Sequence, residues 1–112
     1  MKTKPSILVV CGRNKRRSKT AETIFRDSNE FSIKSVGLSP KSPSQISESQ
    51  IVWADLIFVM EDGHKSRILD QFRHLALPEI AVLHIEDEYD YMDDELVEML
   101  KEDISNVIKQ EL

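Results

Sequence analysis

Short apolar runs alternate with amphipathic stretches along this chain. Residues 6–10 and 56–60 are continuous apolar runs rich in branched side chains, which is typical of strands buried on both faces of a sheet. Residues 31–36 alternate apolar and polar side chains, as an edge strand does, and residues 80–83 form a fourth short run. The pattern therefore predicts four strands.

Helical spacing fills the segments between these strands. We expect a helix over residues 18–28 with Ser18 as its N-cap, and a long final helix over residues 93–108. Residues 47–50 have the form of a capping box, which predicts a short helix that carries three residues toward the core: Ile51, Val52 and Trp53. Another helix follows Gly63 and extends toward the break at Pro78, with apolar positions at Ile68, Leu69, Phe72 and Leu75.

This alternation of strands and helices predicts an α/β fold. Strands joined by helices pair in parallel through right-handed crossovers, so we expect a three-layer α/β/α domain with a four-stranded parallel sheet, formed by residues 1–112 as one domain. In open sheets of this kind, ligands bind beyond the carboxyl ends of the strands. The loop that leaves the first strand is therefore the first candidate for a site.

Composition narrows the class of protein. With 40% hydrophobic residues in 112, the chain can form one core, and no apolar run approaches the roughly 18 residues that span a bilayer. We therefore expect a cytoplasmic protein that does not enter a membrane. Cys11 is the only cysteine, which excludes an internal disulfide and a multi-cysteine zinc site. Neither a metal nor a cofactor is predicted.

The net charge of −5 is unevenly distributed. Residues 1–60 contain ten Lys and Arg against five Asp and Glu, whereas residues 61–112 contain five against fifteen. Five of the cationic side chains lie between positions 13 and 19, which is dense enough to attract an anion. The acidic second half argues against a long nucleic-acid groove and favours a small anionic ligand at one basic site.

The cationic segment lies in the loop after the first strand, residues 11–18. A loop between a buried strand and a helix N-terminus points backbone N–H groups into one concavity, so the amides from Gly12 onward form a cradle of phosphate size. The positive potential of these N–H groups and of the helix N-terminus favours the thiolate of Cys11, which makes this side chain a candidate nucleophile. Arg17 offers a planar fork for two phosphoryl oxygens, and Ser18 can donate its hydroxyl to the sulfur.

Each of these residues also has a purely structural interpretation. A free cysteine at a strand end is more often a small buried apolar residue, but arginine and serine at these offsets favour catalysis. Arg13, Lys15 and Arg16 either steer a ligand or form a solvated rim. The three histidines show no metal-ligand spacing, so we expect them at the surface, whereas three large apolar residues are predicted to be core: Trp53, Phe58 and Met60.

At this loop the sequence resembles the low-molecular-weight protein tyrosine phosphatase family, whose loop reads Val-Cys-x-Gly-Asn-x-Cys-Arg-Ser-Pro. Five residues match this motif: Val10, Cys11, Asn14, Arg17 and Ser18. Residues 35–37 are similar to the family's Ser-Ala-Gly after its second strand, and residues 54–60 are similar to its third strand. Residues 85–89 resemble the loop that carries the family's general acid. These segments span most of the chain.

The resemblance implies a phosphotyrosine protein phosphatase I-like domain that works without a cofactor. Cys11 would form a cysteinyl-phosphate, Arg17 would hold the phosphoryl oxygens, and Asp87 would protonate the leaving group, with Asp90 as the alternative acid. The substrate would be a phosphorylated protein or a small aryl phosphate, with phosphate and vanadate as inhibitors. The implied substrate-binding residues are Gly12, Arg13, Asn14, Lys15, Arg16, Ser18 and Tyr89, with Asn14 bracing the loop, Ser35 as its partner, and Tyr89 as an aromatic wall.

The sequence also departs from the family pattern. Arg13 replaces a loop glycine, Arg16 replaces the second cysteine, Lys19 replaces the proline, and Glu88 replaces the proline after the expected acid. The stretch between residues 37 and 54 is short and lacks the aromatic variable loop that helps to recognise phosphotyrosine. These departures affect the expected identity of the substrate more than the expected attack by the Cys11 sulfur.

Four other functions compete with that of a phosphatase. A thioredoxin-coupled arsenate reductase needs further cysteines, and a cysteine-phosphorylated sugar carrier has no use for a hydrolytic arginine with a loop acid. A catalytically weak or inactive phosphate- or phosphopeptide-binding module would need only the loop amides and Arg17, so it stays as the main alternative. A nucleic-acid module built on residues 13–19 would show a steep dependence of binding on salt.

Overall fold

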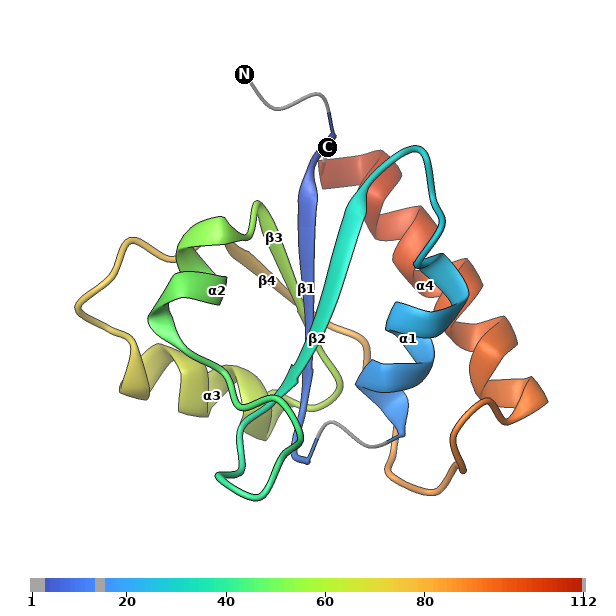
Figure 1. Cartoon of the computed structure of the whole chain (residues 1–112), viewed down its shortest axis with the longest axis horizontal. Coiled ribbons are helices and arrows are strands. Elements are labelled where there is room, and N and C mark those ends of the chain that lie inside the picture. The colour runs from blue at the N-terminus through green and yellow to red at the C-terminus, as the bar shows by residue number, and fades with distance from the viewer. Residues whose placement is uncertain (1–3, 14–15, 112) are drawn as a thin grey trace.

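Four parallel strands form the centre of the protein in a computed structural model that describes residues 4–13 and 16–111. Their order in the sheet is β2-β1-β3-β4, and every neighbouring pair is parallel (Figure 1). The strands are β1 (Ser6–Cys11), β2 (Ser32–Gly37), β3 (Leu56–Val59) and β4 (Glu79–Val82). The two continuous apolar runs are the central strands, and the alternating segment is an edge strand, as predicted.

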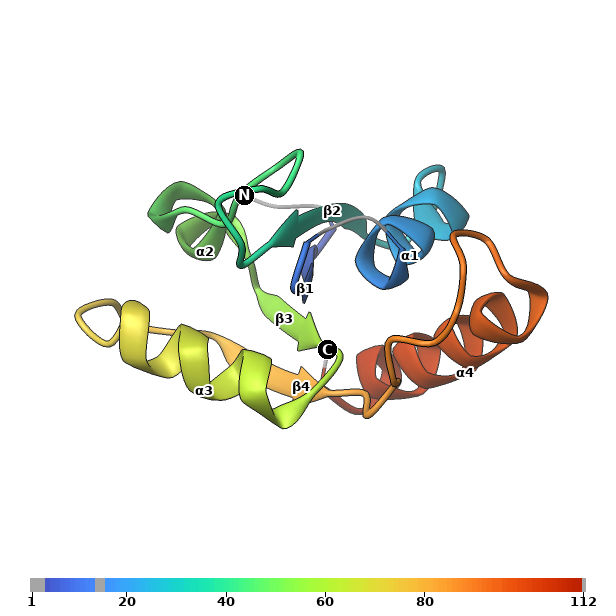
Figure 2. The ribbon, with the colours of Figure 1, turned by 90° about the horizontal axis from the view of Figure 1, so that it is seen from below.

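Helices cover both faces of this sheet. The helices are α1 (Arg17–Phe25), α2 (Glu48–Trp53), α3 (Asp62–Gln71) and α4 (Asp94–Glu111). Figure 2 shows α1 and α4 on one side of the strands and α2 and α3 on the other. This arrangement confirms the predicted three-layer α/β/α architecture with a four-stranded parallel sheet. In the described part of the chain, no helix is long and apolar enough to cross a bilayer.

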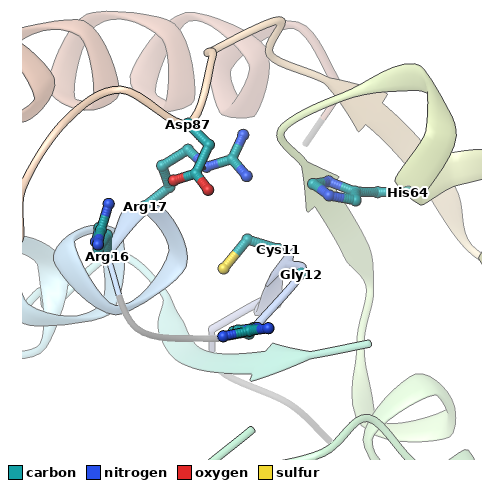
Figure 3. A pocket seen from close by; sticks show the side chains of 7 residues that line it. Cys11, Gly12, Arg16, Arg17, His64 and Asp87 are labelled. Atoms are coloured by element: carbon teal, nitrogen blue, oxygen red, sulfur yellow. The ribbon is translucent and has the colours of Figure 1, made fainter. Parts of the chain in front are cut away.

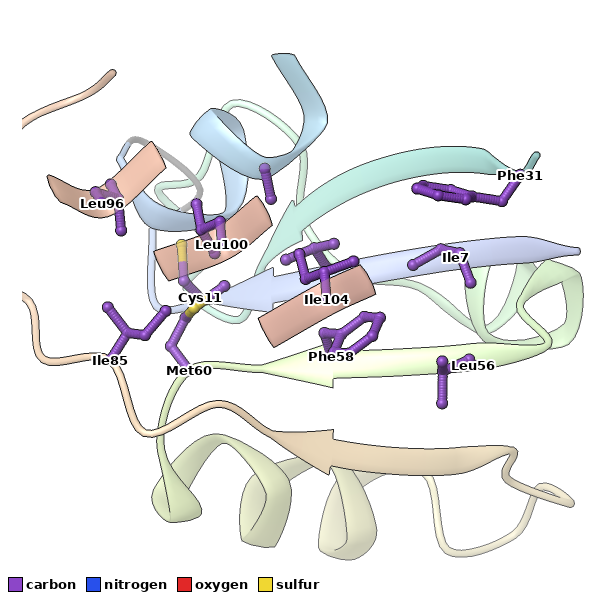
Figure 4. Close-up of a cluster of buried hydrophobic side chains, with 12 residues drawn as sticks. Ile7, Cys11, Phe31, Leu56, Phe58, Met60, Ile85, Leu96, Leu100 and Ile104 are labelled. Carbon is purple, nitrogen blue, oxygen red and sulfur yellow. The ribbon is translucent and has the colours of Figure 1, made fainter. Parts of the chain in front are cut away.

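Two apolar clusters result from the alternation of side chains along the central strands. Ile7, Val9 and Cys11 of β1 point to the α1 and α4 side (Figure 4), whereas Leu8 and Val10 point to the other face. The predicted stripe of the last helix completes the first cluster with three fully buried residues: Leu96, Leu100 and Ile104. Burying a side chain of this size contributes about 1.5–3 kcal/mol, so these contacts hold α4 to the sheet.

Several local predictions were wrong. Ser18 is not the N-cap of α1, because the helix begins at Arg17 and the cap position is Arg16. The third helix ends at Gln71 rather than near Pro78, and turns at residues 72–75 bring Phe72 and Leu75 to the second cluster without a helix. Val52 and Leu69 are exposed, because α2 and α3 each present only a narrow stripe to the sheet.

Other local predictions are confirmed. The capping box is present: the Ser47 side chain accepts from the backbone at position 50, and the Gln50 side-chain oxygen accepts from the Ser47 N–H at 2.7 Å. Phe58 and Met60 are fully buried. The prediction that Trp53 is core was wrong: its side chain is only partly buried against the second cluster, and the Lys34 ammonium lies 4.4 Å from the centre of its ring.

Candidate functional site

A pocket opens at the carboxyl end of β1, where the sequence placed the candidate site. Its volume is about 500 Å³. It lies between the loop after β1, the first turns of α1 and α3, and the loop that follows β4 (Figure 3). The lining residues are Cys11, Gly12, Arg13, Arg16, Arg17, His64 and Asp87. Most of them are charged or polar, and none is aromatic apart from the imidazole.

Cys11 is the last residue of β1 and is only 4% exposed. Its Sγ lies 2.9 Å from the Oγ of Ser18, which is fully buried in the first turn of α1. The hydroxyl of Ser18 therefore faces the sulfur, as its position in the loop predicted, instead of capping the helix. The N-terminus of α1 adds positive potential at this end of the pocket, which favours binding of an anionic ligand.

The segment that follows β2 supports the start of the loop after β1. Leu38 N–H donates to the Cys11 carbonyl at 3.0 Å, and Ser39 N–H donates to the Gly12 carbonyl at 2.8 Å. The Ser42 hydroxyl lies 3.4 Å from the same Gly12 oxygen. These bonds extend the pairing of β1 and β2 beyond the sheet and fix the backbone that carries the sulfur.

Arg17 is 5% exposed, and acceptors from two other parts of the chain hold it in place. Its Nη1 donates to Oε2 of Glu61 and to the carbonyl oxygen of Ile85, each at 2.6 Å. Its Nε lies 3.7 Å from Oδ1 of Asp87. The hydrogen bond from Arg17 holds the pKa of Glu61 below its ordinary value. A buried guanidinium fixed in this way keeps one orientation at the pocket wall.

Glu61, which pairs with Arg17, and His64, which lines the pocket, were not predicted from the sequence. Glu61 directly follows the end of β3 and its neighbour Met60, and His64 lies in the first turn of α3. His64 was expected at the surface but is 9% exposed and lines the pocket, whereas His84 is exposed as predicted. The only available signal was position, since the carboxyl ends of β1 and β3 are adjacent in the sheet.

The structure separates the candidate residues of the acidic loop. Asp87 lines the pocket with a side chain that is 60% exposed, whereas Asp90 is exposed and is not part of the lining. Tyr89 is not part of the lining either: it is partly buried against the cluster between the sheet and α4. The Tyr91 hydroxyl is 2.8 Å from that of Thr23, away from the lining residues.

The remaining predicted residues fall into two groups. Arg13 and Arg16 are exposed at the pocket and belong to its lining. Asn14 and Lys15 lie outside the described residues. Ser35, the expected partner of Asn14, donates its hydroxyl to Glu22 at 3.1 Å. Across residues 4–13 and 16–111, no three His, Cys, Asp or Glu side chains are grouped to hold a metal ion.

Neither a protein-family model nor a curated protein matches the sequence. Solved structures do resemble this one. SP-PTP, a low molecular weight protein tyrosine phosphatase from Streptococcus pyogenes, has a TM-score of 0.78 at 16% identity, with 96% of this chain and 93% of that chain covered. The tyrosine phosphatase Wzb from Escherichia coli K30, in complex with phosphate, has a TM-score of 0.70 at 18% identity, with coverage of 96% and 99%.

A third similar structure is the YwlE arginine phosphatase from Geobacillus stearothermophilus. Its TM-score is 0.66 at 19% identity, with 95% of this chain and 94% of that chain covered. All three comparisons extend over nearly the whole of both chains. The chain therefore has the fold of the low-molecular-weight protein tyrosine phosphatases, which confirms the fold that the loop motif implied. At these identities the likeness concerns the fold, and the chemistry has to be argued from the pocket.

Proposed function

We propose that this chain is a cysteine-dependent hydrolase of phosphoric monoesters, acting on protein phosphotyrosine or a related aryl phosphate. The observation that carries the proposal is the position of the Cys11 sulfur. It lies in a pocket lined by three arginines, 2.9 Å from a buried hydroxyl and at the N-terminus of a helix. A purely structural cysteine has no need of these groups, whereas a thiolate nucleophile does.

The reaction proceeds in two steps. The Cys11 thiolate attacks phosphorus, so that an S–P bond forms while the P–O bond to the leaving group breaks. Asp87 gives its proton to the departing oxygen, and Arg17 with the loop amides stabilises the charge on the other phosphoryl oxygens. In the second step Asp87 accepts a proton from water, the water oxygen attacks phosphorus, and the S–P bond breaks to release phosphate. The Ser18 hydroxyl stabilises the thiolate as it leaves.

Asp87 is a better candidate than Asp90 for the acid. A proton donor must reach the leaving group, and Asp87 lies in the pocket lining close to Arg17, whereas Asp90 does not line the pocket. Arg17 has its Nη1 bound to Glu61 and Ile85. The guanidinium edge formed by Nε and Nη2 is therefore the one that would meet phosphate, with Asp87 beside it.

The residues that line the pocket determine which leaving group it accepts. The similar structures include phosphatases named for tyrosine and one named for arginine. Tyr89 does not line the pocket of this chain, so an aryl group would pack against Arg13, Arg16 and His64 instead of a tyrosine wall. Phosphate and vanadate should bind in competition with substrate. A free catalytic thiol suits a reducing compartment, which supports the predicted cytoplasmic location.

Hydrolysis of p-nitrophenyl phosphate tests the proposal. We expect turnover by the wild-type protein and loss of at least about a thousandfold in Cys11→Ser, because the serine hydroxyl is a poor nucleophile without a general base. Phosphotyrosine and phosphoarginine peptides then rank the leaving groups. Absence of turnover together with binding of phosphate would favour the second candidate, a non-catalytic phosphate-binding module, which needs only the loop and Arg17. Absence of both would reject the site.

A further inference from the structure

The acidic loop between β4 and α4 carries Asp87, and the backbone is strained at both of its ends. In the described part of the chain, only two residues have a positive φ: His84 (57°) before Asp87 and Met92 (64°) after it. Residues other than glycine rarely adopt this left-handed conformation, and it persists only where the surrounding contacts hold it. Such contacts are therefore expected at both ends of residues 84–92.

Ile85 fixes the first end of the acidic loop. Its side chain is 3% exposed, and its N–H donates to the Met60 carbonyl at 3.0 Å. Its own carbonyl oxygen accepts from Arg17 Nη1 at 2.6 Å. Arg17 lies in the first turn of α1, so this end of the loop is bound to the side chain that is proposed to hold the phosphate.

Thr20 holds the second end of the acidic loop. It lies one turn after Arg17 on the same face of α1, and its side chain is fully buried. Its Oγ1 accepts a hydrogen bond from the Met92 N–H at 3.0 Å. The loop passes beside α1 before it enters α4 (Figure 2). One face of α1 therefore binds both ends of the loop, through Arg17 at Ile85 and through Thr20 at Met92.

The position of Asp87 depends on the loop that carries it. Its side chain is 60% exposed and lies beside the Arg17 guanidinium (Figure 3), but the distance from Oδ1 to Nε is 3.7 Å, too long for a hydrogen bond. Tyr89 packs, partly buried, against the cluster between the sheet and α4, which supports the middle of the loop. The contacts at the two ends then determine how closely the Asp87 carboxyl group approaches the pocket.

We propose that Thr20 is a positioning residue for the reaction: by accepting the Met92 N–H, it holds the acidic loop in the conformation that places Asp87 at the leaving group. This inference rests on the proposed function. An acid must meet the leaving oxygen at hydrogen-bond distance, so a displacement of about 1 Å weakens its effect. Without the Thr20 acceptor, the Met92 N–H is unpaired and its left-handed backbone is no longer held, so this end of the loop relaxes.

The ratio of kcat/KM for phenyl phosphate to kcat/KM for p-nitrophenyl phosphate reports how well the acid is placed. Phenolate needs protonation more than p-nitrophenolate does, so a misplaced acid lowers this ratio. Thr20→Val keeps the size of the side chain but removes the acceptor, and we expect the ratio to fall about tenfold. Thr20→Ser keeps the hydroxyl and should stay within about twofold of wild type. A fraction of unfolded protein lowers both values equally and leaves the ratio unchanged.

Thr23→Val is the matched control. Thr23 lies in the same helix and contacts the same loop, but its 2.8 Å hydrogen bond to the Tyr91 hydroxyl is exposed to solvent, so the ratio should stay at its wild-type value. In an Asp87→Asn background, Thr20→Val should lower the ratio no further, because the acid that it positions is already absent. An unchanged ratio in Thr20→Val, or a fall that persists in the Asp87→Asn background, would overturn the inference.

Hydrogen exchange tests the contact without any reaction. We expect the Met92 amide to exchange at least about tenfold more slowly in the wild type than in Thr20→Val, because only the wild type pairs this N–H. Equal rates would contradict the inference even if the ratio fell. Absence of turnover by the wild type on both substrates would reject the proposed hydrolysis and the inference with it, whereas turnover with an unchanged ratio in Thr20→Val would reject the inference alone.

Discussion

The Nη1 atom of Arg17 lies 2.6 Å from Oε2 of Glu61, a contact that joins the first turn of α1 to the N-cap residue of α3 across 44 positions of sequence. Arg17 is almost fully buried, whereas the Glu61 side chain is 49% exposed. The carboxylate therefore provides a counter-charge for a guanidinium that would otherwise be buried with little compensation. It also fixes the Nη1 end of the guanidinium.

Replacing Glu61 by Gln should change the dependence of stability on pH. The hydrogen bond from Arg17 holds the pKa of Glu61 below its ordinary value of 4.5, so the ionised carboxylate stabilises the folded state above that pH. This contribution is lost as the pH falls through the lowered pKa. Thermal unfolding between about pH 5 and 3 should therefore show a shallower fall in Tm for Glu61→Gln than for the wild type.

Glu30→Gln, in the exposed turn before β2, is the control for a general loss of negative charge. Its Tm should follow the wild-type curve more closely than that of Glu61→Gln. Equal slopes for the wild type and Glu61→Gln would show that the contact between Arg17 and Glu61 contributes nothing to folding in solution.

Ser18→Ala should slow the second chemical step more than the first. The hydroxyl of Ser18 lies 2.9 Å from Cys11 Sγ, where it stabilises the thiolate that leaves when the cysteinyl-phosphate is hydrolysed. We expect kcat to fall about tenfold and a burst of released nitrophenol to appear in rapid-mixing experiments. Ser44→Ala, at an exposed loop position, should keep wild-type kinetics. A reduced kcat without a burst would assign Ser18 to the first step instead.

Asp87→Asn and Asp90→Asn form a matched pair for the general acid. Only Asp87 lines the pocket, so its replacement should lower kcat by about a hundredfold with phosphotyrosine. The loss should be smaller with p-nitrophenyl phosphate, whose leaving group needs less protonation. Asp90→Asn should retain nearly full activity with both substrates. The reverse order of the two variants would transfer the acid to Asp90.

Neutralising Arg13 and Arg16 should weaken substrate capture. Both side chains are exposed in the pocket lining, where their charge attracts a phosphate dianion before it meets Arg17. The double variant Arg13→Gln/Arg16→Gln should raise KM about five- to tenfold at low salt and flatten the dependence of kcat/KM on ionic strength. Lys101→Gln, on the exposed face of α4, removes a charge far from the pocket and should leave that dependence unchanged. A salt dependence that persists in the double variant would place the steering charge elsewhere.

Local pattern was sufficient to predict most of the fold and part of the site. The central strands and the last helix carry strong apolar periodicity, and Cys11, Arg17 and Ser18 lie close together in sequence at the end of β1 and the start of α1. Glu61 and His64 could not be found in this way, because only the pairing of β1 with β3 brings Glu61 to Arg17 and His64 to the pocket. Tyr89 is the opposite case: an aromatic residue beside an acid suggested a pocket wall, but its side chain packs, partly buried, against the cluster between the sheet and α4.

Gly37, the last residue of the edge strand β2, lies close to the backbone of Arg13 in the loop after β1. Gly37→Ala should therefore disturb both segments. A Cβ at this position would lie 2.9 Å from the carbonyl carbon of Arg13 and still closer to the side chain of Ser42. The added Cβ would contact the backbone of Arg13 and not its flexible side chain. This close contact can be relieved only if the loop after β1 moves. We expect a loss of about 1–3 kcal/mol in the free energy of unfolding, measured in urea, with a fall in kcat/KM.

Two further variants show whether crowding causes this loss. Gly63→Ala places its Cβ in open space within α3, so the helix should gain up to about 1 kcal/mol. Adding Ser42→Gly to Gly37→Ala removes the nearest side-chain atoms but leaves the contact with Arg13. The double variant should therefore recover part of the stability while kcat/KM stays low, since the displaced backbone is the one that follows Cys11. Full recovery of both quantities would mean that Ser42 alone is crowded and that the loop tolerates the added carbon.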